Sequence, residues 1–154
     1  MPDAQKVIQA PAPAAGADWT VTPSDTDRVR IDTVTAVLVT SATVANRLPA
    51  LQIVDQNGLI VWAADLQAPQ AASETVRYSW ARGSGVSAST AVTTTRSLSG
   101  PLPFTWLEPG DSLQVVTGAI AAADQWGVTT VRFCSAEEWE SLQLLERLRS
   151  ALGG

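Results

Sequence analysis

LPALQIVDQNGLIVWAA, residues 48–64, predicts a β-hairpin and decides the fold class. Asn57 and Gly58 lie between two apolar runs, and both accept positive φ at little cost, as a two-residue type I′ turn requires. A turn centred on this pair predicts three cross-strand partners: Val54 with Val61, Ile53 with Trp62, and Leu51 with Ala64.

The two faces of this hairpin are expected to have different surroundings. One face carries four apolar residues and is predicted to be core: Leu51, Ile53, Ile60 and Trp62. The other face carries Val54, Leu59 and Val61, which makes it more apolar than a solvated sheet face usually is. We therefore expect another surface to cover these three residues, either the N-terminal arm, the terminal helix or a second subunit.

Further β-type runs, separated by turns rich in Gly, Pro, Asp and Ser, occur along the rest of the chain. In the run at residues 74–81, strict alternation places Val76, Tyr78 and Trp80 on the inward face. The other runs lie at residues 18–22, 28–40, 91–98, 111–121 and 128–134. The pattern predicts a mainly β chain, an antiparallel β-sandwich or jelly roll of about eight strands.

Three regions follow from these patterns: an extended N-terminal arm at residues 1–17, the β-sandwich at 18–134 and an amphipathic helix at 135–154. The arm is rich in Ala and Pro and lacks strand or helix periodicity. Such a segment becomes ordered most readily on another surface, so Val7, Ile8, Pro11 and Pro13 are candidate contact residues. Packing on its own domain, or on a crystal neighbour, is the alternative.

The helix has a clear start and a clear stripe. Ser135 and Glu138 form a capping box, with Ser135 as N-cap. Four leucines then recur at helical spacing on one face: Leu142, Leu145, Leu148 and Leu152. This stripe is expected to pack on itself or on a neighbour.

Trp139 falls outside this stripe and points toward the polar side of the helix. One interpretation is that the first helical turn packs against the preceding strand and hides the indole there. The other is that Trp139 lies at a subunit interface, where Trp is enriched.

Composition argues against several functions. The 154-residue chain has a net charge of −5 and no cluster of Lys or Arg, so nucleic acid is not expected as a partner. No segment has the length and apolarity of a membrane span, so no membrane partner is expected. Histidine is absent, which removes Ser-His and Cys-His nucleophile pairs and histidine metal sites. The single cysteine, Cys134, is expected to be a small buried hydrophobe at a strand end.

The acidic residues offer little alternative chemistry. A glycosidase-type carboxylate pair needs two acids across a cleft, but most Asp residues here lie at predicted turns, where Asp is favoured for bonding to backbone. Asp25, Asp27 and Asp124 could in principle bind calcium, although no EF-hand-type loop occurs. We expect no enzyme activity, no metal and no cofactor.

The tryptophans leave a binding role open. Trp62 and Trp80 are expected in the core. Trp106 and Trp126 lie next to loops, where a core position and a surface contact are equally compatible with the sequence. Sugar-binding β-sandwiches use such rings as stacking platforms.

Several segments together resemble small, Ala- and Thr-rich structural proteins of tailed bacteriophages. They are WTVTP at 19–23, TSATVANRLPALQIVDQNG at 40–58, YSWARG at 78–83, PGD at 109–111 and DQWG at 124–127. Such proteins include head decoration, or cement, proteins, which are often β-rich trimers on an icosahedral shell and have no catalytic residues. The terminal leucine helix has no match in that pattern.

The resemblance implies a virion protein on the capsid surface, assembled in the host cytoplasm, with the major capsid protein as partner and a homotrimer as its state. The candidate contact residues would then be those of the arm, the hairpin, the helix and the tryptophans named above. A tail-associated receptor- or carbohydrate-binding module, using Trp106, Trp126 and the loop at residues 82–90, is the alternative. The part of the virion stays open at this point.

Overall fold

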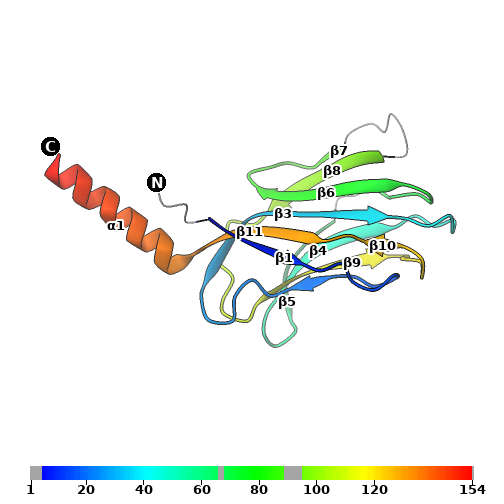
Figure 1. Cartoon of the computed structure of the whole chain (residues 1–154), viewed down its shortest axis with the longest axis horizontal. Helices are drawn as coiled ribbons and strands as arrows, with labels where there is room; N and C mark the ends of the chain where they lie inside the picture. The colour runs from blue at the N-terminus through cyan, green and yellow to red at the C-terminus, as the bar shows by residue number, and fades with distance from the viewer. Residues whose placement is uncertain (1–4, 66–67, 89–94, 154) are drawn as a thin grey trace.

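The computed structural model describes residues 5–65, 68–88 and 95–153, and shows a mainly β chain with one C-terminal helix (Figure 1). One sheet has seven strands, in the order β1-β11-β3-β6-β8-β7 with β10 paired to β3, and the other has four, in the order β2-β9-β4-β5. The elements are β1 (Gln5–Ala10), β2 (Thr20–Val21), β3 (Val29–Val39), β4 (Leu48–Val54), β5 (Ile60–Asp65), β6 (Thr75–Arg82), β7 (Ser87–Ala88), β8 (Thr95–Leu102), β9 (Ser112–Gly118), β10 (Gln125–Trp126), β11 (Thr129–Ser135) and α1 (Ala136–Leu152).

The predicted hairpin is present as β4 and β5, but its turn is longer than predicted. The backbone N–H of Gly58 donates to the Asp55 carbonyl at 3.0 Å, and only Gly58 of the loop has positive φ, at 82°. The Asp55 carboxylate accepts the N–H groups of Asn57 and Leu59, each at 2.8 Å. This side chain stabilises a three-residue loop, so the two-residue turn was a wrong prediction.

The changed turn and an irregularity in the ladder alter the pairing near the loop. Ile53 pairs with Trp62 and Leu51 with Ala64, as predicted, but Val54 pairs with Ile60. The prediction of Val54 opposite Val61 is therefore wrong. A second consequence is that Ile60, predicted as core, is 58% exposed.

One hydrophobic core draws its residues from both sheets. Val34 and Tyr78 come from the seven-stranded sheet, and Leu51 and Leu113 come from the four-stranded sheet. All three inward residues predicted for β6 are fully buried: Val76, Tyr78 and Trp80. Trp62 lies partly buried against this core, and Cys134 is buried at the end of β11, as predicted.

The strand pairing departs from the predicted pattern in one place. β6 and β8 run parallel over eight paired residues, while the other strand pairs are antiparallel. The prediction that all strands pair antiparallel is thus wrong. The predicted jelly-roll connectivity stays a prediction. Of the strand predicted at residues 91–98, positions 91–94 lie outside the described residues, and the rest belongs to β8.

The segment predicted as an arm without strand structure forms β1, an edge strand of the seven-stranded sheet. It pairs antiparallel with β11, from Gln5 opposite Cys134 to Ala10 opposite Thr129. The alternative of packing on its own domain is the one that the structure shows. After β1, the chain passes close to Ala122 at Gly16, where a Cβ would lie 2.8 Å from the Ala122 Cα.

This pairing makes a testable prediction. A Gln5→Cys substitution places a thiol directly opposite the natural Cys134, and opposite residues in an antiparallel pair lie within disulfide range. Mild oxidation should form an intrachain disulfide, seen as the loss of both free thiols without a covalent dimer on a non-reducing gel. Burial raises the pKa of the Cys134 thiol, so the reaction is best run at alkaline pH.

Gln9→Cys is the matched control, because Gln9 lies opposite Thr130 and should form no intrachain disulfide. Two free thiols remaining in the oxidised Gln5→Cys protein would contradict the pairing of β1 with β11.

Candidate functional site

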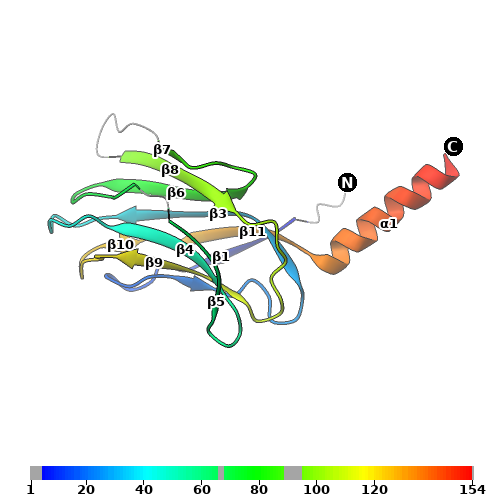
Figure 2. The ribbon, with the colours of Figure 1, turned by 180° about the vertical axis from the view of Figure 1, so that it is seen from behind.

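The terminal helix α1 is the most exposed element of the chain. Ser135 caps it, accepting the Glu138 N–H, as predicted from the capping box. The helix extends away from the two sheets (Figures 1 and 2), and none of its residues is buried. Of the predicted stripe, Leu142 is half-buried, whereas Leu145, Leu148 and Leu152 are 60%, 50% and 86% exposed. The helix therefore presents an apolar row to solvent.

Among the described residues, the contacts between α1 and the sheets are made by its first turn. The Arg30 guanidinium of β3 lies 4.4 Å from the centre of the Trp139 ring and 5.7 Å from that of Trp106. Lys6 of β1 forms an ion pair with Glu138 at 3.2 Å. Cation–π contacts of this kind help to orient the helix start. The ring of Trp139 lies against the domain but stays 36% exposed, so the structure matches the packing interpretation only in part.

A second apolar surface lies on the outside of the four-stranded sheet. Its ladder pairs place Ala50 beside Val116, Gln52 beside Gln114 and Leu48 beside Gly118. We call this the small-sheet outer face and define it by the outward residues of these ladders together with the exposed residues of β5: Leu48, Ala50, Gln52, Val54, Ile60, Val61, Ala63, Asp65, Ser112, Gln114, Val116 and Gly118. Asp65, the last residue of β5, is charged, and the other residues of this face are not.

The hairpin residues predicted to be covered belong to or border this face. Val54 is half-buried, whereas Leu59 and Val61 are 64% and 58% exposed in the single chain. Sequence reasoning missed Leu48 and Val116, which are 47% and 44% exposed. The alternation of β9 could have identified Val116. Leu113 and Val115 point into the core, and Val116 is an apolar residue on the outward face between polar ones.

The remaining candidate residues are dispersed. Val7 is 50% exposed on β1, and Ile8 packs against the core. Pro11 is exposed, and Pro13 is half-buried with its carbonyl accepting the Gln125 side-chain amide at 2.8 Å. Trp106 is half-buried beneath Arg30.

Trp126 is not a surface residue. It is fully buried, packs edge-on against Trp19 with ring centres 6.3 Å apart, and donates its indole N–H to Asp18 at 3.2 Å. Placing Trp126 in a candidate contact was therefore wrong. Its position beside a turn concealed that β10 pairs with β3 and turns the ring inward.

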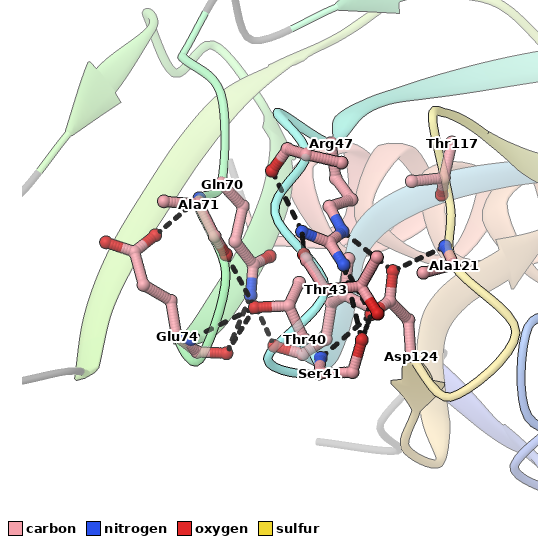
Figure 3. A network of polar contacts seen from close by, with 12 residues as sticks. Thr40, Ser41, Thr43, Arg47, Gln70, Ala71, Glu74, Thr117, Ala121 and Asp124 are labelled. Atoms are coloured by element: carbon pink, nitrogen blue, oxygen red, sulfur yellow. Dashed lines mark hydrogen bonds and ion pairs between the residues drawn. The ribbon is translucent and has the colours of Figure 1, made fainter.

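A buried polar network lies where three loops meet (Figure 3). Arg47 and Asp124, both with fully buried side chains, form two parallel bonds of 2.8 and 2.9 Å. The remaining Arg47 donors bond to the carbonyls of Thr43 and Ala45, and Asp124 also accepts from Ser41 and from the Ala121 N–H. Every charged atom therefore has a partner, which marks this pair as structural.

Gln70 extends the network into the sheets. Its backbone pairs with that of Arg47, its side-chain amide donates to the Leu38 carbonyl at 2.9 Å, and it accepts from the Tyr78 hydroxyl at 3.0 Å. Burial raises the pKa of Tyr78, so this hydroxyl stays a donor over the ordinary pH range.

Two further acids also accept hydrogen bonds from groups of the fold. Asp18 accepts the Thr117 N–H and hydroxyl at 2.9 and 2.6 Å, and Asp111 accepts the Glu108 N–H. Among the described residues, no three His, Cys, Asp or Glu side chains are grouped as a metal site would need. Within the same residues, no helix has the length and apolarity to cross a membrane.

Comparisons with known proteins add no identification: no family model, no curated protein and no solved structure matches this chain. The two apolar surfaces, the row on α1 and the small-sheet outer face, are thus the candidate functional features.

The Arg47–Asp124 pair makes a prediction about stability. Asp124→Asn should lower the free energy of unfolding at neutral pH by about 3–5 kcal/mol, because a buried guanidinium loses its counter-charge. Burial alone would raise the pKa of Asp124, but hydrogen bonds from Arg47, Ala121 and Ser41 outweigh it and lower the pKa to about 2.

The stabilisation is therefore complete above the unfolded-state pKa of 3.8 and is lost as the pH falls toward 2. Urea unfolding should show the difference between wild type and Asp124→Asn shrinking over that interval. Asp25→Asn, at an exposed loop position, should change stability by less than about 0.5 kcal/mol. Equal stability of Asp124→Asn and wild type at pH 7 would show that the pair does not hold the loops.

Proposed function

We propose that this protein is a non-enzymatic structural component of a tailed-phage virion, a capsid decoration protein that binds and stabilises the shell of the major capsid protein. It would sit on the capsid surface after assembly in the host cytoplasm. The fold that we propose to accompany this role is a β-sandwich, with the two sheets facing each other across their shared core.

The observation that carries the proposal is the small-sheet outer face. Its exposed members include Leu48, Ile60, Val61 and Val116, at 47%, 58%, 58% and 44% exposure. The one charged residue of this face, Asp65, lies at the end of the edge strand β5. Apolar surface with charge only at its rim is typical of a binding surface, since the centres of interfaces are depleted in charge. A broad sheet face suits a broad partner such as a shell.

The rest of the site geometry agrees with a binding role. Three acids stabilise the fold: Asp124 and Asp18 accept backbone and side-chain donors, and Asp55 stabilises its turn. With Trp126 in the core, the tail-associated carbohydrate-binding alternative loses one of its two tryptophans. Decoration at many copies would add binding free energy to the shell, with avidity if the protein is oligomeric.

Binding to shells tests this proposal. Empty shells assembled from the major capsid protein of the phage that encodes this chain should bind it saturably in co-sedimentation. Val116→Lys should weaken that binding about tenfold or more, because a charge would be buried in the contact. Val116 is exposed in the single chain, so the fold should tolerate the change.

Val128→Lys is the matched control, since Val128 is similarly exposed at 52% but lies in the loop between β10 and β11. It should bind shells like wild type. Absence of shell binding by the wild type would overturn the proposed function, and equal losses in the two variants would remove the small-sheet outer face from it. A glycan array with hits, in place of shell binding, would favour the tail-associated module.

A further inference from the structure

The row of leucines on α1 has no partner among the described residues. Leu144, Leu145, Leu148 and Leu152 are each at least half exposed, and the 17-residue helix buries none of its side chains. In proteins, most of the stability of a helix comes from tertiary packing of its apolar face. Within the described part of the chain, only its first turn contacts the domain, through Trp139 and Glu138. The remaining turns therefore need a covering surface.

The spacing of the leucines suits another helix of the same kind. Leu145, Leu148 and Leu152 are separated by three and then four residues, the a and d spacing of a coiled-coil seam. Side chains at such positions insert between those of a facing helix with the same repeat. This surface is thus complementary to a second copy of itself, whereas a flat sheet face offers no matching ridges.

The charges beside the row are balanced. Glu146 and Arg149 border the apolar surface that Leu142, Leu145, Leu148 and Leu152 line. One acid and one base at this rim leave it without a net charge, so copies of the helix can approach there without repulsion between like net charges. A partner of strong single charge would meet one repulsive contact for each attractive one.

The width of the apolar surface sets how many neighbours each helix needs. At 100° per residue, the leucines from Leu144 round to Leu142 span an arc of roughly 160°. A two-helix seam uses only the narrower a and d stripe, so a pair would leave leucines at the edges wet. In a bundle of three, each helix contacts two neighbours, and together these neighbours cover the wider arc of leucines.

We infer that α1 is a self-association element, which packs against α1 of other copies of this chain in a bundle of at least three helices. The inference needs no shell and is independent of the proposed function. It makes the terminal helix the assembly element and leaves the small-sheet outer face free for a different partner.

The experiment measures the mass of the full-length protein in solution, without shells, by light scattering over a range of micromolar concentrations. The wild type should have at least three times the 16.2 kDa mass of one chain. A Leu145→Gln/Leu148→Gln double variant should run as the single chain. Its tryptophan-monitored unfolding at low concentration should match wild type, because no residue of the helix is buried in the part of the chain that the structure describes.

Two control variants separate packing from general disturbance of the helix. Gln143→Ala/Ser150→Ala changes the opposite face and should keep the wild-type mass. Leu145→Met/Leu148→Met conserves side-chain volume and should keep it as well. A wild-type mass of one or two chains, or an unchanged mass of the glutamine double variant, would overturn the inference. Shell binding is read separately, so either idea can fail alone.

Discussion

The buried ion pair between Arg47 and Asp124 is the contact on which the loop end of this domain depends. Arg47 precedes β4 of the four-stranded sheet, and Asp124 precedes β10 of the seven-stranded sheet, so one pair links the two sheets. Burying two charges is costly unless each hydrogen-bonding atom has a partner. Here the backbone of Thr43, Ala45 and Ala121 supplies those partners, which fixes the loops in one arrangement.

The loop end around Arg47 and Asp124, where the polar groups are hydrogen-bonded within the domain, contrasts with the two apolar surfaces. The small-sheet outer face and the row on α1 leave Val116 and Leu145 in water, while the polar groups of the network are bonded. The contacts of Arg30 with Trp139 and of Lys6 with Glu138 tie the start of α1 to β3 and β1. The domain thereby carries two apolar surfaces, one on its small sheet and one on the helix that follows β11.

The sequence predicted an element correctly where the interactions that form it lie within a short segment of the chain. Strong alternation identified β6, and a capping box located the start of α1 at Ser135. The hairpin was found, yet its turn differed because the Asp55 carboxylate bonds two N–H groups beyond it. β1 was missed because its side chains are mostly exposed and show no periodicity; its strand exists through the ladder to β11.

By itself, the sequence determined the mainly β character, the hairpin, the terminal helix and its leucine row, since each rests on periodicity or turn chemistry within a short segment. Only the tertiary structure decided the parallel pairing of β6 with β8, the burial of Trp126 and the pairing of Arg47 with Asp124. Those outcomes join residues far apart in the chain. Their free energy comes from burying side chains between elements, which no local pattern encodes.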